Sequence, residues 1–241
     1  MYPFEDLRSA WDSLYRSVAA RVPGAPRELR WDIDPHETWL DPQMALSQAC
    51  GWPLVTALGE RVCVLGTFAN VTDGEPSPLY RSVIVASRGA DVAALGHGRA
   101  AINSDDSLSG FISLLNAFGA AVPSWPGAVT WTGSHRASID AVRSGTADVA
   151  SIDALTWRFL QRLMPETLDG LEVVARGPLV PCLPLLVPAA TSSGTFAAWR
   201  ASFAAAMVDP GLGDVRGVLL IDDFVPMDRA DYDTALAGLL W

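Results

Sequence analysis

The chain has 241 residues, of which 50% are apolar and 18% charged, and its formal net charge is −10. This composition indicates a folded globular protein, because disordered chains combine low hydrophobicity with high net charge. The 17 basic residues form no run, which argues against nucleic acid or anionic lipid as the main partner. All of them are arginine, so chemistry that depends on a lysine Schiff base or a Walker A lysine is excluded.

The cysteines and histidines imply no metal and no cofactor. Cys50, Cys63 and Cys182 are odd in number and far apart, as expected of free thiols rather than a disulfide framework. The three histidines are equally dispersed. The N-terminus shows no basic segment followed by an apolar one, and the apolar stretch 179–190 is too short to span a bilayer. As written, the chain is expected to be cytoplasmic, or periplasmic if its true start lies upstream.

Taken in chain order, the apolar pattern predicts a helix over 7–18 that ends before Pro23-Gly24, an extended piece at 28–33, and buried strands at 61–68 and 80–87. Beyond residue 88, short strands alternate with helices, which is typical of an α/β domain. We predict strands at 99–103, 128–132 and 147–151, and helices over 108–118, 137–142 and 155–163. Extended segments at 171–176 and 183–187 and helices over 195–207 and 229–239 complete the chain.

The strand-to-helix junctions carry the candidate site, since ligands of open α/β sheets bind at the carboxyl ends of strands. At the first junction, Ser107, Ser109 and Gly110 stand where a helix begins. Backbone N–H groups there, together with the helix dipole, favour a bound anion. Plain capping of the helix by Asp106 or Ser107 is the alternative interpretation.

Two further junctions hold polar residues of the same kind. Ser134 and His135 open the second helix, where the histidine would donate a hydrogen bond to a bound anion, and Asp153 follows the third strand. Asp153 would either cap its helix or accept a hydrogen bond from a cationic part of the ligand. A hydrolytic triad of Ser107 or Ser109 with His135 and Asp153 is disfavoured, because neither serine lies in a GxSxG motif.

Five segments, in this order, carry a family resemblance: 46–54 (LSQACGWPL), 80–85 (YRSVIV), 103–110 (NSDDSLSG), 133–138 (GSHRAS) and 147–153 (ADVASID). Together they resemble the phosphate-, phosphite- and phosphonate-binding subunits of ABC importers. The resemblance implies the type II periplasmic-binding-protein fold, with two α/β lobes that each contain a mixed sheet flanked by helices.

The resemblance also implies a domain organisation and a role. Lobe 1 would comprise residues 1–80 plus 181–241 and lobe 2 residues 81–180, with chain crossings near 80–87 and 173–187. A small oxyanion would be held in the cleft between the lobes and delivered to an ABC permease. Neither catalysis, nucleic-acid binding nor a span across the membrane is expected.

The ligand-binding positions that the resemblance implies are Tyr80, Ser107, Leu108, Ser109, Gly110, Ser134, His135 and Asp153, joined by Gln48, Cys50 and Trp52 of the first segment. Among the nine tryptophans, Trp52 is the best candidate for a ligand platform, and packing in the core or on a lobe surface is the alternative interpretation. Leu108 stands where the family has a threonine, and Asp105 and Asp106 flank the cradle, so the identity of the anion is left open. Two other functions are weighed: an enzyme of the same fold that uses His135 and Asp153 as acid and base, and a ligand sensor that signals to a protein partner.

Overall fold

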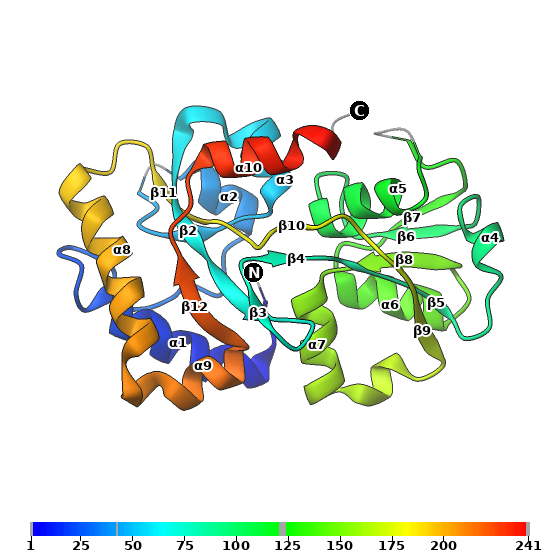
Figure 1. Ribbon diagram of the computed structural model, residues 1–241, viewed down its shortest axis with the longest axis horizontal. Coiled ribbons are helices and arrows are strands. Elements are labelled where there is room, and N and C mark those ends of the chain that lie inside the picture. The colour runs from blue at the N-terminus through cyan, green and yellow to red at the C-terminus, as the bar shows by residue number, and fades with distance from the viewer. Residues whose placement is uncertain (1, 42, 121–123, 240–241) are drawn as a thin grey trace. The chain divides into compact units, whose positions relative to one another are not determined.

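A computed structural model describes residues 2–41, 43–120 and 124–239 of the chain, which fold into two compact units (Figure 1). Unit 1 is formed by Met1–Leu79 and Pro181–Ala235, and unit 2 by Tyr80–Val180 with the chain end from Leu236 onward. The sequence analysis had assigned the whole of 181–241 to the first lobe. The strands β4 (Leu79–Tyr80) and β10 (Val180–Pro181), which pair with each other, lie at the two borders.

The sheet of unit 1 has five strands, in the order β1-β11-β2-β12, with β3 also paired to β2. Their bounds are β1 Ser47–Gln48, β2 Val62–Val71, β3 Pro76–Ser77, β11 Leu185–Pro188 and β12 Ile221–Val225. The described strand pairs are all antiparallel, where the sequence suggested a mixed sheet. The strands β11 and β12, which come from the last third of the chain, and β3, which directly follows β2, all run against β2. The extended piece expected at 28–33 forms no strand.

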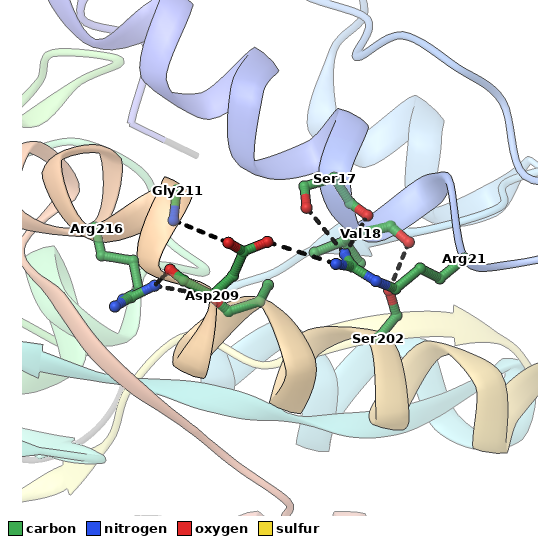
Figure 2. A network of polar contacts seen from close by, with 8 residues as sticks. Ser17, Val18, Arg21, Ser202, Asp209, Gly211 and Arg216 are labelled. Atoms are coloured by element: carbon green, nitrogen blue, oxygen red, sulfur yellow. Dashed lines mark hydrogen bonds and ion pairs between the residues drawn. The ribbon is translucent and has the colours of Figure 1, made fainter.

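In unit 1, the helix α1 (Glu5–Ala19) packs against both α8 (Ser193–Val208) and α9 (Gly213–Leu219). Figure 2 shows the polar contacts that join them. The buried Ser202 hydroxyl donates to the Val18 carbonyl at 2.6 Å, and the Arg21 guanidinium lies 3.5 Å from the Asp209 carboxylate. Arg216 donates to the carbonyl of Asp209 at 2.9 Å, so this side chain closes the turn between α8 and α9.

The remaining elements of unit 1 lie in the first 61 residues and near the end of the chain. They are α2 (Pro35–Leu40), α3 (Gly51–Pro53), the π-helix η1 (Leu54–Leu58), the 3₁₀ turns η2 (Gly59–Arg61) and η5 (Pro210–Leu212), and α10 (Arg229–Leu236). Several of them build a core cluster with the sheet, in which Trp39, Leu54, Val64 and Leu186 meet the ring of Tyr232. Tyr232 is fully buried, and its hydroxyl donates to the Cys182 carbonyl at 2.7 Å.

The sheet of unit 2 has the order β7-β6-β8-β5-β9 and positions the candidate site. Its strands are β5 (Val83–Ser87), β6 (Ala100–Ile102), β7 (Val129–Trp131), β8 (Val149–Ile152) and β9 (Leu171–Arg176). β6 runs parallel to both β7 and β8, as the strand–helix alternation predicted, while β5 pairs antiparallel with β8 and β9. The apolar β8 is buried along its length, because helices cover the sheet.

Helices lie on both sides of this sheet (Figure 1). The π-helix η3 (Leu108–Ile112) continues into α5 (Ser113–Ala117) and packs on β8, and α6 (His135–Arg143) packs on β5, β6 and β8. The other elements of unit 2 are α4 (Val92–Leu95), α7 (Ala154–Leu163), the 3₁₀ turn η4 (Pro165–Leu168) and, at the chain end, η6 (Ala237–Leu239). Within the described ranges, no helix has both the length and the apolar character needed to cross a bilayer.

Candidate functional site

Parallel pairing of β6 and β7 brings two helix starts to one edge of the unit 2 sheet. The chain leaves β6 at Asn103 and enters η3 after Ser107, and it leaves β7 at Thr132 and enters α6 after Ser134. The Gly133 N–H donates to the Asn103 carbonyl at 3.1 Å, which fastens the two loops to each other. This edge is the carboxyl end of both strands, where open α/β sheets bind ligands.

A serine caps each of the two helix starts. The Ser107 hydroxyl accepts from the Gly110 N–H at 2.9 Å, and the Ser134 hydroxyl accepts from the Ala137 N–H at 3.1 Å. Of the two residues proposed as the first cap, Ser107 takes the role, while the Asp106 carboxylate accepts from the Ser104 hydroxyl at 2.6 Å. Each cap satisfies one N–H, and the first turn of a helix still presents further N–H groups without intrahelical acceptors.

Ser109 and His135 join the two helix starts directly. The Ser109 hydroxyl lies 2.9 Å from Nε2 of His135, and Ser109 is buried. The Ser151 hydroxyl of β8 donates to the Ser109 carbonyl at 2.5 Å. Residues from η3, α6 and β8 therefore form one connected group, although Ser109 and His135 stand 26 positions apart in the sequence.

The His135 ring is held in its neutral form. Burial lowers its pKa below the usual value, and this effect outweighs the nearby Asp153 carboxylate and the Ser151 backbone, which both favour the charged form. Nδ1 of His135 is buried and has no partner in hydrogen-bonding geometry. The ring can thus give or take one hydrogen bond toward Ser109 without adding a formal charge to the site.

Asp153 takes the first of the two roles that the sequence suggested as alternatives, the cap of its helix. Its carboxylate accepts from the Thr156 N–H at 2.8 Å and so caps α7, and the residue is only 3% exposed. Its charge also acts on His135. The cap contact differs from the contact that the orienting acid of a hydrolytic triad makes with its histidine.

Asn103, which was not among the predicted ligand-binding positions, is part of the same group. A Cβ built on Gly110 would lie 1.7 Å from the Asn103 Oδ1, so only glycine permits this close approach. In the part of the chain that the structure describes, four buried side-chain polar atoms lack a hydrogen-bond partner, and Asn103 Oδ1 and His135 Nδ1 are two of them. The sequence signal that could have identified Asn103 is its place as the first residue after β6, at the carboxyl end of that strand. Ser151 gave a second signal, as a hydroxyl inside a buried apolar strand.

Tyr80 and Leu108, also predicted for the site, are buried in unit 2. Tyr80 ends β4 and is 4% exposed. Leu108 begins η3 and is 1% exposed, so its side chain belongs to the core and only its backbone can face a ligand.

The other three predicted residues belong to unit 1. The Gln48 amide donates to the Leu183 carbonyl at 3.5 Å, beside the pairing of β1 with β11. Cys50 is a half-buried free thiol that precedes α3, and the half-buried Trp52 lies within that helix. These residues are not part of the connected group around Ser109 and His135 and remain ligand-binding expectations.

Two surface hollows lie away from all the predicted residues. One, of about 220 Å³, is lined in unit 1 by Pro23, Met44 and Trp199 among others. The other, of about 380 Å³, is lined in unit 2 by Asp91, His97 and Asp148 among others. Among the described residues, no group of three or more histidine, cysteine or acidic side chains is arranged to hold a metal ion.

Comparison with known proteins gives one family. The family model described as the periplasmic phosphonate substrate-binding protein of ABC transporters matches residues 43–232. No curated protein matches the chain.

Solved structures are similar over almost the whole chain. PhnD1 from Prochlorococcus marinus, in complex with methylphosphonate, is 14% identical with a TM-score of 0.78, over 98% of this chain and 93% of that one. A binding protein component of an ABC phosphonate transporter from Pseudomonas aeruginosa is 16% identical with a TM-score of 0.75, over 98% and 81%. A Xanthomonas citri protein bound to ATP is 17% identical with a TM-score of 0.67, over 99% and 92%. At such identities the likeness shows the fold, and it confirms the predicted fold class.

Proposed function

The chain belongs to the family of phosphonate substrate-binding proteins of ABC transporters, and from this premise we propose that it binds a small phosphonate or phosphate-like oxyanion at the edge of the unit 2 sheet. The family comprises substrate-binding proteins rather than enzymes, which sets aside the enzyme alternative. It also makes an ABC permease the expected protein partner.

One observation carries the proposal: the Ser109–His135 hydrogen bond of 2.9 Å, which fixes two helix starts side by side. Helix N-termini bind anions through their N–H groups and the positive end of the helix dipole. Two such ends at one sheet edge, with two hydroxyls and a neutral imidazole between them, offer several donors to the oxygens of one small anion. The buried, unpartnered polar atoms of Asn103 and His135 support a polar ligand at this edge.

The ligand would be held by hydrogen bonds alone. None of the site residues predicted in unit 2 is lysine or arginine, and His135 is neutral. Donors of this kind discriminate by geometry, because each must meet an oxygen at about 2.7–3.2 Å. Ser109, His135 and the first-turn N–H groups of η3 and α6 are the groups we assign to the anion, and Tyr80 and Asp153 remain predicted ligand-binding residues of unit 2.

Ligand-induced stabilisation tests the proposal. Thermal unfolding is measured with millimolar phosphate, phosphite, methylphosphonate, 2-aminoethylphosphonate and ATP, the last because the similar Xanthomonas protein is bound to it. A ligand present at one hundred times its Kd raises the unfolding free energy by about 2.7 kcal/mol. Ser109→Ala is expected to remove most of this shift.

Ser144→Ala is the matched control, since this exposed serine lies at the far end of α6, where its hydroxyl contacts the Ala141 carbonyl and the Thr146 hydroxyl. It should leave the shift unchanged. An unfolding midpoint of the wild-type protein that none of the five compounds raises would rule the proposal out.

A further inference from the structure

We propose that Trp131 binds the organic substituent of the ligand, and that the protein therefore prefers phosphonates or phosphate esters with an aromatic substituent to inorganic phosphate. This inference rests on the proposed function, because it assumes that the oxyanion is held by η3 and α6. It adds a specificity-determining side chain that the sequence analysis did not single out.

The first observation is exposure. Of the eight tryptophans that the structure describes, Trp131 alone is exposed, with 57% of its surface accessible. Indole carries a large apolar area and is among the side chains that gain most from burial. The other described tryptophans of unit 2, Trp125 and Trp157, are buried. An indole left in water is thus unusual for this protein.

The second observation is position. Trp131 is the last residue of β7 and is aligned with Ile102, the last residue of β6. It therefore stands at the carboxyl edge of the sheet, beside the loops that lead into both helix starts. Ser134, the cap of α6, follows only three residues later.

The third observation is the direction of the side chain. Thr132 turns toward α6, where its hydroxyl lies 2.6 Å from that of Ser138. Side chains alternate along a strand, so Trp131 points to the opposite side of the sheet, toward η3. There its ring meets Phe111 in an edge arrangement, with centroids 5.9 Å apart and planes at 79°. Phe111 directly follows Gly110, so the indole is anchored against the helix whose first turn we assign to the oxyanion.

These observations define a ligand with two ends. The hydrogen-bond donors of η3 and α6 would hold the oxyanion, and the exposed indole would stack on a flat apolar group attached to it. The carboxylates of Asp105 and Asp106, in the loop before η3, disfavour a second negative charge on the substituent. Inorganic phosphate has no substituent and would use the donors alone. A neutral aromatic group therefore fits this edge of the sheet.

The experiment compares phenylphosphonate, methylphosphonate and inorganic phosphate by isothermal titration on the wild-type protein, Trp131→Ala and Trp131→Phe. Tryptophan fluorescence is recorded in parallel, because a ring stacked on Trp131 changes its emission. Leu40→Ala is the control, since Leu40 is an apolar side chain of similar exposure, at 60%, on unit 1.

We expect the wild-type protein to bind phenylphosphonate more tightly than methylphosphonate and phosphate. Trp131→Ala should weaken phenylphosphonate binding about five- to tenfold, leave methylphosphonate within about twofold and abolish the fluorescence change. Trp131→Phe should restore most of the affinity, and Leu40→Ala should change nothing. Equal effects of Trp131→Ala on all three compounds, or none on any, would overturn the inference while the proposed function stands. A wild-type protein that binds none of the three would overturn both.

Discussion

Gly110→Ala tests the close approach at the centre of the candidate site. A Cβ at this position would lie 1.7 Å from Oδ1 and 2.8 Å from Cγ of Asn103, and 3.1 Å from the Ser107 hydroxyl. The first two distances are impossible for non-bonded atoms, so the Asn103 amide has to move. The third is tight and disturbs the bond from the Gly110 N–H to the Ser107 hydroxyl.

The magnitude follows from two opposing effects. Alanine in place of glycine inside a helix is ordinarily stabilising by about 1 kcal/mol. Overpacking of a closely packed site costs about 1–3 kcal/mol. The second effect dominates here because Gly110 is fully surrounded, so we expect a net loss of about 1 kcal/mol, or about 2–4 °C in Tm. Oxyanion binding should weaken as well, because the cap and the first turn of η3 shift with the side chain.

Thermal and urea unfolding of three variants provide the assay. Gly217→Ala is the control: it is an exposed glycine inside α9 with no atom within 4 Å of an added Cβ, and it should stabilise the protein. The double variant Asn103→Ala with Gly110→Ala removes the clash and should be more stable than Gly110→Ala alone. If Gly110→Ala stabilised the protein as much as Gly217→Ala does, the close approach would be refuted.

Three further predictions concern the pH dependence of stability, a helix cap and a surface ion pair. Because burial lowers the pKa of His135 in the folded protein, the unfolded chain binds a proton on this histidine first as pH falls through about 6.5. The free energy of unfolding should therefore decline by at most about 1.4 kcal/mol per pH unit. Urea unfolding at pH 7.5 and 5.5 should show a smaller decline for His135→Asn than for the wild-type protein. Asp153→Ala removes the α7 cap on Thr156 and should cost about 1 kcal/mol, whereas Asp153→Ser should retain most of the stability in the same assay. Arg99 bonds Asp148 at 2.6 Å, but both side chains are solvated, so a double-mutant cycle with Arg99→Ala and Asp148→Ala should give a coupling energy below about 1 kcal/mol, and a larger one would contradict this exposure.

The elements that the sequence predicted well are those with local signals. The helix expected over 108–118 occupies 108–117 as η3 and α5, and Gly119 beyond its end adopts a φ of 65°. The helix expected over 137–142 spans 135–143, with Gly145 at a φ of 73°. Apolar spacing and a glycine with positive φ near the end are both legible without tertiary structure.

The elements that were missed depend on distant partners. The strand β12 contains the adjacent acidic residues Asp222 and Asp223, which are poor strand formers. Both side chains are exposed, yet the backbone pairs with β2, where Phe224 is aligned with Phe68. Conversely, the extended piece at 28–33 has strand-like composition but no strand. Strand formation requires a neighbour, and a single sequence does not identify which distant segment provides it.

The candidate site also combines local features with features that depend on tertiary packing. The two helix starts with their serines are local features that the sequence indicated. The Ser109–His135 bond arises only when β6 and β7 pair in parallel at a particular register, and the close approach of Asn103 to Gly110 depends on how η3 packs after β6. Trp131 illustrates the limit of sequence-based prediction most clearly, because no motif includes it and its exposure is a property of the folded structure.

The charge of the protein constrains how such a site works. At a net charge of −10 the long-range field opposes an approaching anion, but exposed charges are screened beyond about 8 Å at physiological salt. The attraction must then come from donors in direct contact, and in the proposed site the neutral His135 would provide one without a formal charge. Such a site gains little from the total charge of the ligand and much from the position of each oxygen. Selectivity among oxyanions would therefore depend on the shape of the ligand and on its substituent. The exposed indole of Trp131 would contact that substituent.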